Sequence, residues 1–503
     1  MEKPKSRTML SDHGRTLLMS EILIFVVATN IILMIFATIL TRFKIFSEAR
    51  AMTAPVFALT LIPAFYMDLG TSFQIETIAS EGLAQWWYYA ASWYPAYVLG
   101  IIFAGLIRST GVHLTLPDRL SQYGQLAEFL SAIVSYLYLM PLGSIFAIGI
   151  ILSLLTGYTV PIWATMLIAG IILSLFTAEY GWSGYSITGL IYFLVMAFGI
   201  GVTCITMINV AGGWSTIRAT LPESYFHPWF TEFGGFIQGL RDPATLLWFL
   251  MGFSFIIDPM VWQRFSLTEN EDAARKGMLF AFIFYLLFDL TTVGSGLALA
   301  TLGGEYYVDT AFEMMPEVAG GLMISGVLLA AIAGNSAYLH SGGLIFSQNI
   351  AKAIGLLSWD ALQDDKEARE WYKKGVYLLG ALGTIIIIIL NSLMPEDPVT
   401  TAWLIQSGIL FGGLAVPVIV GGVLYREKIP PESIEYGILL GLVTTIFSII
   451  GGFLYPNYTG VITLGITPET ATGTPLIDAS RVLGFCATII GMILGYIINK
   501  IRD

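Results

Sequence analysis

The sequence contains few of the residues on which disulfides, metal centres and many catalytic sites depend. Among its 503 residues there are two cysteines, Cys204 and Cys486, and four histidines. Both cysteines stand inside apolar runs, where a thiol serves as a small core side chain, so we expect neither a disulfide nor a cysteine metal site. The histidines show no metal-ligand spacing and no nucleophile motif accompanies them, so the sequence predicts neither an enzyme nor a bound cofactor.

Charged residues are equally scarce. They make up 12% of the chain, against about 25% in an average soluble domain. The 24 Lys and Arg residues are spread thinly and the net charge is −11, so nothing favours nucleic-acid binding. Instead, 56% of the residues are hydrophobic, in runs such as "EILIFVVATNIILMIFATIL" and "YLLGALGTIIIIILNSLM". Runs of this length predict an all-α polytopic membrane protein surrounded by membrane lipid.

The apolar runs predict about thirteen transmembrane helices in one domain. Residues 1–19 form a polar tail without the pattern of a cleavable signal peptide, and residues 20–503 form the single transmembrane domain. We number the predicted helices 0 to 12. They cover residues 20–41, 52–75, 84–107, 126–155, 158–178, 187–211, 243–263, 277–302, 318–350, 374–394, 400–424, 434–454 and 482–500.

Basic residues in the connecting segments predict the orientation of these helices. Cytoplasmic segments of membrane proteins carry an excess of Lys and Arg. With the N-terminus outside, 17 of the 24 Lys and Arg fall in inner segments and seven in outer segments, four of these in the N-terminal tail. We therefore expect a multi-pass protein of the cell membrane, with its N-terminus outside and its C-terminus in the cytoplasm.

Four segments resemble, in the right order, the sodium:solute symporter family. The segment "LTLPDRLSQYGQ" resembles the family's Pro-x-x-Leu-x-x-Arg-Tyr-Gly pattern, and "GGWSTIRATLP" resembles its exit from helix 5. The segment "DPMVWQRFSLTENEDAARKG" resembles its Asp-x-x-x-x-Gln-Arg pattern, and "FGGLAVPVIVGGVLYREKIPP" its Ala-x-x-Pro helix 10 with the basic loop that follows. The match covers about residues 60–460.

The resemblance implies a LeuT-type fold. Helices 1–5 and 6–10 would then form two inverted repeats, residues 52–211 and 243–424, while helix 0 and the helices within residues 434–500 are peripheral. In such folds the substrate and the ions bind near the middle of the membrane, where helices 1 and 6 unwind. The predicted orientation agrees, because helix 1 starts inside and helix 6 starts outside.

Helix 1 has the features of an interrupted helix. Pro63 removes a backbone hydrogen bond, and Gly70 weakens the helix further. Asp68 stands between them, where a carboxylate is costly, so we expect it to bind a cation or a proton, or to contact a cationic substrate. The alternative is that Asp68 caps the second half of the helix. The resemblance adds helix-1 carbonyl oxygens, here that of Ala64, as ion ligands.

Helices 1, 2 and 6 carry the candidates for substrate binding. Gly252 and Ser254 mark the expected unwound point of helix 6, and Asp258 further along either binds an ion, pairs with Arg264 or caps a helix. Aromatic residues at these positions also suit core packing, and those of helix 2 also suit an interfacial belt. The substrate candidates are Phe65, Tyr66, Gln74, Trp87, Phe253, Ser254 and Phe255.

The stretch "LLAAIAGNSAYLHSGG" on helix 8 departs from the family pattern. The family keeps two adjacent small hydroxyl residues there, whose oxygens hold a sodium ion together with helix-1 carbonyls. Different alignments place this pair on Ala333-Gly334, Gly334-Asn335 or Tyr338-Leu339, and none of them gives adjacent Ser or Thr residues. Some members line a second ion site with Thr-Asp-x-x-Gln, where this chain has Thr188-Gly189-x-x-Tyr192.

Other polar residues can replace the missing ligands. Asn335 and Ser336 can supply oxygens to a cation, together with Asp68. Alternatively, protons are the coupling ion, through Asp68, Asp289 or His340, since histidine titrates near neutral pH. Two of these residues also have structural explanations: Asp289 can pair with His340 or Asn335, and His340 can be a satisfied core residue.

Two functions of different classes fit these features. The first is a secondary active transporter of a small polar solute, working by cation-coupled symport with sodium or protons and by alternating access. The second is a transporter-like membrane sensor or accessory subunit that binds a ligand without coupled transport. The identity of the solute and the oligomeric state are not predicted, because a fold alone does not fix them.

Overall fold

The regular structure of the described residues is helical, which confirms the predicted all-α class. Nine helical segments among these residues are long and apolar enough to cross a membrane. Predicted helix 0 lies outside the described residues except for Ile32, as does the first part of predicted helix 6. The computed structural model describes residues 32, 52–65, 69–111, 114–227, 252, 254–304, 307–308, 310, 317–357, 365–394, 398–425, 428–455 and 476–502.

Predicted helices 1 and 2 correspond to three helices of the structure. α2 (Ala54–Phe65) contains Pro63 near its end, and α3 (Leu69–Glu81) begins after residues 66–68, which lie outside the described part. α4 (Leu83–Ser109) matches predicted helix 2.

Predicted helix 3 is interrupted, which the sequence analysis did not anticipate. It consists of α6 (Gln125–Tyr138) and α7 (Leu142–Leu155), and Pro141 stands directly before the second of these. The pyrrolidine ring has no N–H to donate and clashes with the preceding helical turn. The single helix expected over residues 126–155 is therefore wrong in this detail, and Pro141 is the physical reason.

Predicted helices 4 and 5 are joined in one helix, α8 (Ile162–Val210). We expected a loop between residues 178 and 187, where two glycines stand. The backbone instead stays helical there, because a glycine weakens a helix by only about 1 kcal/mol and does not by itself end it. Two stretches of α8, Ile162–Glu179 and Gly189–Val210, are each apolar enough to cross a membrane.

The second half of the chain follows the predicted order of helices. Predicted helix 6 appears as α12 (Ser254–Ile257) and α13 (Pro259–Leu267). The later helices are α14 (Glu271–Leu302), α16 (Glu317–Ile345) with its π-helical extension η4 (Phe346–Ala351), α17 (Asp365–Leu393), α18 (Pro398–Val416) with its π-helical extension η6 (Pro417–Leu424), α19 (Pro431–Leu454) and α20 (Leu476–Arg502).

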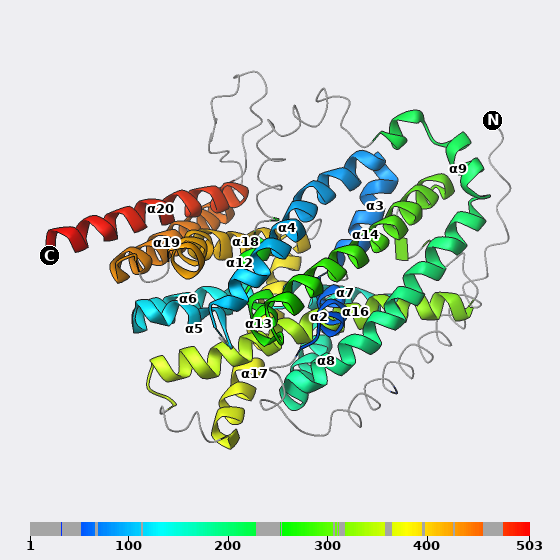
Figure 1. Ribbon diagram of the computed structural model, residues 1–503. Helices are drawn as coiled ribbons and strands as arrows, with labels where there is room; N and C mark the ends of the chain where they lie inside the picture. The colour runs from blue at the N-terminus through cyan, green and yellow to red at the C-terminus, as the bar shows by residue number, and fades with distance from the viewer. Residues whose placement is uncertain are drawn as a thin grey trace.

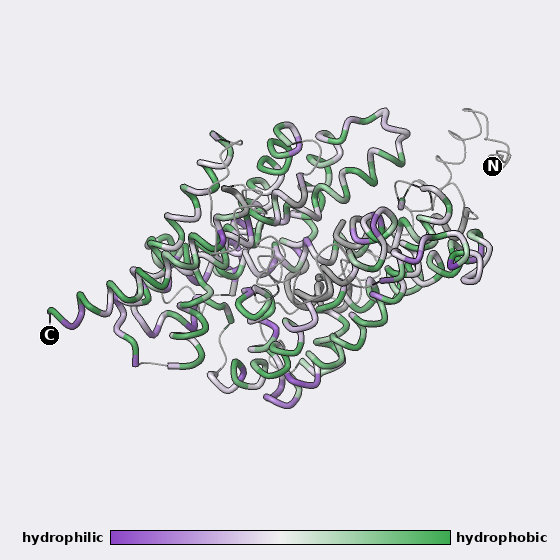
Figure 2. The backbone as a smooth tube through the Cα atoms, turned by 90° about the horizontal axis from the view of Figure 1, so that it is seen from above, coloured by the Kyte–Doolittle hydropathy of each residue, from purple (hydrophilic) through white to green (hydrophobic). Residues whose placement is uncertain are grey.

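α16 lies at the centre of the bundle and α20 at its edge. In the most apolar 18-residue stretch of each helix, 94% of the residues are buried in α16, but only 28% in α20. α19 and α20 run side by side at the end of the molecule that carries the C-terminus, and α2, α7 and α16 meet near its middle (Figure 1). The view from above shows the same two helices projecting from one end (Figure 2).

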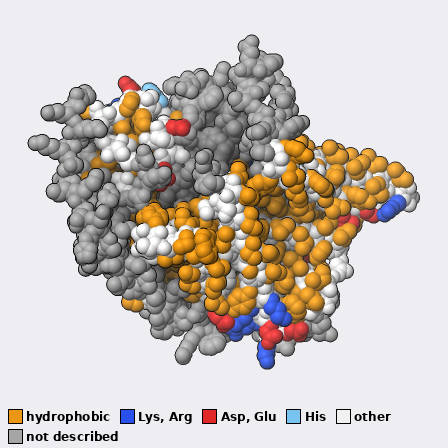
Figure 3. All heavy atoms as spheres, turned by 180° about the vertical axis from the view of Figure 1, so that it is seen from behind, with side chains coloured by type: hydrophobic (Ala, Val, Ile, Leu, Met, Phe, Trp, Pro, Cys, Tyr) orange, Lys and Arg blue, Asp and Glu red, His pale blue; other side chains and the backbone are white. Residues whose placement is uncertain are grey.

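The outer surface is suited to lipid. Apolar side chains cover much of the described surface on the face shown in Figure 3, while charged side chains gather at its edges. Inside the bundle, backbone bonds join the start of α2 to the end of α13: Met52 N donates to Leu267 O at 3.0 Å, and Glu269 N donates to Met52 O at 3.2 Å. The start of α2 and the end of α13 are thus tied together.

The last three helices pack through glycine, and this close approach gives a test of the fold. A Cβ atom at Gly441 of α19 would lie 2.0 Å from the Gly412 carbonyl oxygen of α18 and 1.9 Å from Thr488 Oγ1 of α20. We predict that Gly441→Ala lowers the thermal midpoint of unfolding, since overpacking costs about 1–3 kcal/mol.

The matched control is Gly201→Ala on α8, where the added Cβ would meet no atom within 4 Å. This variant should unfold at or above the wild-type temperature, because alanine favours a helix over glycine. Thermal unfolding in detergent, followed by fluorescence, compares the two variants. Equal midpoints for both variants would contradict the packing of α18, α19 and α20.

Candidate ion and substrate site

The C-terminal end of α2 faces α16 at Gly334. The Ala64 carbonyl oxygen lies 3.4 Å from the position that a Cβ of Gly334 would occupy, and Ser144 Oγ of α7 lies 3.5 Å from the same point. The last carbonyl groups of a helix have no partner within the helix and carry partial negative charge. Because Gly334 has no side chain, these two oxygens of α2 and α7 lie close to the backbone of α16.

The next two residues of α16 are buried polar groups without partners. Asn335 is 0% exposed and Ser336 is 3% exposed. Within the described part of the chain, neither the Asn335 amide nor the Ser336 hydroxyl has a hydrogen-bond partner. An unpaired buried polar group costs about 1–3 kcal/mol. Two such buried groups therefore follow Gly334 in succession on α16.

Helix 6 is interrupted at Asp258, which caps its second half. The Asp258 carboxylate accepts hydrogen bonds from Met260 N at 2.7 Å and from Val261 N at 3.2 Å. A carboxylate at a helix N-terminus satisfies free N–H groups and opposes the positive end of the helix dipole. The structure therefore supports the cap among the explanations considered for Asp258. Gly252 and Ser254, where we expected the unwound point, are helical themselves.

The interruption of helix 3 meets the interruption of helix 6. Tyr138, the last residue of α6, donates its hydroxyl proton to Asp258 Oδ2 at 2.6 Å. On the other side, Gln406 of α18 donates from Nε2 to the Tyr138 carbonyl at 2.7 Å and also to the Met140 carbonyl. The backbone groups freed by the two interruptions are thus satisfied by side chains of neighbouring segments, as a site away from water requires.

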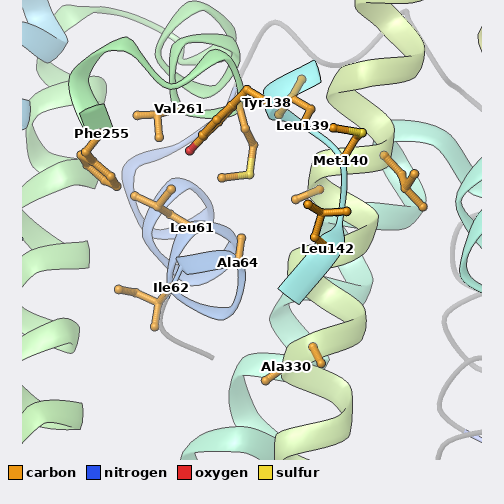
Figure 4. Close-up of a cluster of buried hydrophobic side chains, with 14 of the residues drawn as sticks. Leu61, Ile62, Ala64, Tyr138, Leu139, Met140, Leu142, Phe255, Val261 and Ala330 are labelled. Atoms are coloured by element: carbon orange, nitrogen blue, oxygen red, sulfur yellow. The ribbon is translucent and has the colours of Figure 1, made fainter. Parts of the chain in front are cut away.

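Figure 4 shows the apolar packing around these interruptions. Side chains of α2, of the segment between α6 and α7, and of α12, α13 and α16 share one buried cluster, and Ala64 belongs to it. The residues labelled there are Leu61, Ile62, Ala64, Tyr138, Leu139, Met140, Leu142, Phe255, Val261 and Ala330.

His340 joins three helices. Its Nδ1 lies 2.8 Å from the Tyr372 hydroxyl of α17. That hydroxyl donates to the Thr177 carbonyl oxygen of α8 at 3.3 Å. The Tyr372 oxygen must then accept the hydrogen bond from His340, which places the imidazole proton on Nδ1. One residue further, Ser341 donates to Gln263 Oε1 of α13 at 2.6 Å. The end of this stretch therefore connects helices rather than facing the end of α2.

Asp289 lies in a different place from Asn335 and Ser336. It stands on α14, is 2% exposed and accepts a hydrogen bond from the Tyr94 hydroxyl of α4 at 2.7 Å. Asp289 is thus bonded to Tyr94 of α4, whereas His340 is bonded to Tyr372 of α17.

The substrate candidates are described to different degrees. Gln74 of α3 is 7% exposed, and its Nε2 has no hydrogen-bond partner among the described residues. Ser254 and Phe255 are buried, and the Phe255 ring lies 5.0 Å from the Tyr97 ring of α4, centre to centre. The remaining predicted residues lie outside what the structure describes: Asp68, Tyr66 and Phe253 entirely, and Phe65 and Trp87 in their side chains.

Three residues of this region were not predicted from the sequence. Tyr138 and Gln406 satisfy the helix interruptions, and Ser144 approaches Gly334. Pro141 was the available signal for the first of these, because a proline inside an apolar run interrupts the helix and leaves backbone groups to be satisfied. Nothing in the local sequence around Gln406 indicates its partner, since the contact depends on the packing of α18 against α6.

Comparison with known proteins shows the fold. No family model matches the chain, and no curated protein matches it. A structure of a Na+-coupled sialic acid symporter, in a substrate-bound outward-open state, matches with a TM-score of 0.66 and 13% identity, covering 95% of this chain and 97% of that one. The chain therefore has the fold of that symporter, the LeuT-type fold that the sequence predicted.

Two other solved structures are similar over most of their length. Mhp1, a nucleobase-cation-symport-1 family transporter in a closed conformation with bromovinylhydantoin bound, has a TM-score of 0.49 and 14% identity, covering 90% of this chain and 95% of that one. A manganese transporter of Eremococcus coleocola has a TM-score of 0.49 and 13% identity, covering 89% and 94%.

We predict that the Asp258 cap stabilises the folded protein. Asp258→Ala removes the cap, which is worth about 1 kcal/mol, and leaves the Tyr138 hydroxyl buried without its acceptor, which costs about 1–3 kcal/mol more. We expect a lower thermal midpoint in detergent. Asp258→Asn retains an acceptor at the cap, so its thermal midpoint should fall by less. If Asp258→Ala unfolds at the wild-type temperature, Asp258 does not hold this interruption.

Proposed function

We propose that the protein is a cation-coupled symporter of a small polar solute, of the sodium:solute symporter type, and that it works by alternating access. One observation carries the proposal: the buried and unpartnered Asn335 and Ser336 stand beside Gly334, which faces the Ala64 carbonyl at the end of α2. The symporter with the similar fold is described as Na+-coupled, and we propose that sodium is the ion held by this group.

The chemistry of the oxygens suits a hard monovalent cation. Such ions are bound by several uncharged or charged oxygens, by the same reasoning that applies to Ca²⁺ and Mg²⁺. The Ala64 carbonyl, the Asn335 side-chain carbonyl and the Ser336 hydroxyl provide oxygens of this kind, and Ser144 adds a further hydroxyl close by. Asp68 completes the proposed set from the sequence. The partial negative charge at the end of α2 adds to the attraction.

Such an ion would couple binding to a change of shape. It would hold the end of α2 against α16, two segments that are distant in the sequence. A ligand shifts a conformational equilibrium by its difference in affinity for the two states. If the ligand set is complete only while α2 and α16 are in contact, sodium favours that state, and release of the ion allows the two helices to separate.

The remaining parts of the proposal concern the arrangement around the ion. We propose inverted repeats over residues 52–211 and 243–424, with the helices within residues 434–500 peripheral to them and the N-terminus outside the cell membrane. For the solute we propose a small polar molecule that contacts Phe65, Tyr66, Gln74, Trp87, Phe253, Ser254 and Phe255. The buried amide of Gln74 supports this, because its Nε2 has no partner among the described residues.

The proposal is tested by sodium binding. Purified protein in detergent is titrated with radioactive ²²Na+ in a scintillation proximity assay. We predict saturable binding that falls about tenfold or more in Asn335→Ala and in Ser336→Ala, since loss of one interaction with a charged ligand removes about 1.5–3 kcal/mol. Uptake by proteoliposomes under a sodium gradient, screened over amino acids, carboxylates and sugars, should fall in the same variants.

Ser325→Ala is the matched control. Ser325 stands on the same helix, is 0% exposed and likewise has no hydrogen-bond partner for its hydroxyl in the described part of the chain. It lies eleven residues from Ser336, or about 16 Å along the helix. This variant should bind sodium as the wild type does. Equal sodium binding in all four proteins would contradict the proposed ion site.

A further inference from the structure

A second buried polar cluster lies between helices 2 and 7, apart from the proposed sodium site. On α14, Tyr285 and Asp289 are four residues apart and share one face; on α4, Tyr94 and Tyr97 are three residues apart and share another. The two pairs face each other, with the Tyr97 and Tyr285 rings 4.8 Å apart and the Tyr94 and Tyr285 rings 6.1 Å apart, centre to centre. Tyr94 donates its hydroxyl proton to Asp289 Oδ2 at 2.7 Å.

The cluster lies deep in the membrane-spanning part of α14. Asp289 comes 18 residues after Glu271 and 13 residues before Leu302, which places it about 27 Å and about 20 Å from the two helix ends. A carboxylate at such a depth is expensive and marks a functional site by default. Its side chain is buried together with both of its neighbours, Tyr97 and Tyr285.

A second observation indicates that this cluster binds something. The Tyr97 side chain is 0% exposed, and its hydroxyl has no hydrogen-bond partner among the described residues. Its ring lies 4.8 Å from the ring of Tyr285, which stands one helical turn before Asp289 on α14. A buried hydroxyl without a partner costs about 1–3 kcal/mol. A protonated Asp289 would be a hydrogen-bond donor that the Tyr97 oxygen could accept from.

The packing limits which cation can enter. The rings around Asp289 are in direct contact, with Tyr97 and Phe282 stacked at 5.6 Å and Tyr97 and Tyr285 tilted at 4.8 Å. An organic cation would need these rings to separate. A sodium ion would need room for several oxygens at bonding distance around it, whereas the rings of this cluster are packed against one another. A proton needs neither space nor a shell of ligands, and a phenol can donate to a carboxylate or accept from a carboxylic acid.

Among the described residues, two charged side chains on elements packed against α14 have other partners: Arg108 of α4 donates to the Thr268 carbonyl, and Glu179 of α8 pairs with Lys373. The charge of Asp289 acts on the three tyrosines Tyr94, Tyr97 and Tyr285. Of the other elements packed against α14, α3 carries Glu76 and Glu81, α8 carries Cys204 against Gly294, and α9 carries Arg218, which lies over an aromatic ring outside α14. The described part of α2 has no titratable side chain.

The cluster also touches the interrupted helix 6. The Phe255 ring of α12 lies 5.0 Å from the Tyr97 ring and 6.1 Å from the Trp93 ring, so α12 rests on the same aromatic face of α4 that bonds to Asp289. α12 is four residues long and is followed directly by the interruption at Asp258. Ring contacts therefore connect the helix that carries Tyr94 to the segment before the interruption.

From these contacts we propose that Asp289 is a proton-binding site, so that the symporter carries a proton together with its solute and sodium. The carboxylate takes up a proton from one side of the membrane, becomes a neutral carboxylic acid that remains bonded to Tyr94, and gives the proton to the other side; no bond other than O–H forms or breaks. This inference rests on the proposed function, and it adds a second coupling ion at a separate place.

The test uses the full-length protein in proteoliposomes on a solid-supported membrane, without sodium and without solute. A pH jump should produce a transient charge movement in the wild type. Asp289→Asn should abolish it, and Asp289→Glu should retain it. Asp272→Asn, the same substitution on an exposed residue of α14 whose side chain is 69% exposed, should leave it unchanged. A sodium jump, applied to every variant, separates this inference from the proposed sodium site.

A sodium-driven signal with no pH-driven signal in the wild type would overturn the proton site and leave the sodium proposal standing. A pH-driven signal that survives in Asp289→Asn would also overturn it. Infrared difference spectra between acid and alkaline buffer add a readout that a structural role would not give. They should show the C=O band of a protonated carboxyl, absent from Asp289→Asn and shifted in Tyr94→Phe, because the Tyr94 bond changes the band position. A band that remains in Asp289→Asn would contradict the assignment.

Discussion

An interrupted helix inside a membrane leaves backbone N–H and C=O groups that water cannot reach, and the arrangement of this protein depends on how those groups are satisfied. The carboxylate of Asp258 holds the first N–H groups of α13 and also accepts from Tyr138, the last residue of α6. Gln406 holds carbonyls of the same interruption in helix 3. Two interruptions and the start of α18 are fixed relative to one another by these few side chains.

The end of α2 is arranged differently, and this difference underlies the proposed function. Its Ala64 carbonyl faces Gly334, which has no side chain to offer, and the neighbouring Asn335 and Ser336 have no partner among the described residues. The interruptions at Asp258 and after Tyr138 are closed by protein groups, whereas at the end of α2 we propose that an ion is bound. The second proposed site, at Asp289, has a different character: one buried carboxylate bonded to Tyr94, with the rings of Tyr97 and Tyr285 packed against each other beside it. We therefore propose two different cations for the two sites, and α12 packs against α4 beside the second of them.

Much of the fold followed from the sequence because apolar length is a strong signal. The order of the described helices was predicted correctly from apolar runs. The interruption that Pro63 predicts in helix 1 falls at residues 66–68, which lie outside the described residues. Pro141 carried the same signal in helix 3 and was not used. The loop expected near Gly181 and Gly184 is helical, because glycine weakens a helix without ending it.

Candidate residues could be recognised from the sequence by their type, but their contacts could not. A buried Asn335 or Asp289 is unusual enough in an apolar run to be recognised as a candidate. Their partners are set by tertiary packing, and no local pattern shows that Asp289 would meet Tyr94, 195 residues away in the chain, or that His340 would be tied to Tyr372. The cap formed by Asp258 was foreseen only as one of several explanations, because a carboxylate before a proline fits a cap and an ion ligand equally well.

The most direct measurement of the central claim is a pair of high-resolution experimental structures, determined in sodium chloride and in choline chloride. The account predicts a density feature in sodium chloride alone, bounded by the Ala64 carbonyl, the Asn335 side-chain oxygen and the Ser336 hydroxyl, at distances suited to a bound cation. If both structures show Asn335 and Ser336 hydrogen-bonded to protein groups with no such feature, the claim that α2 and α16 hold a coupling ion is contradicted.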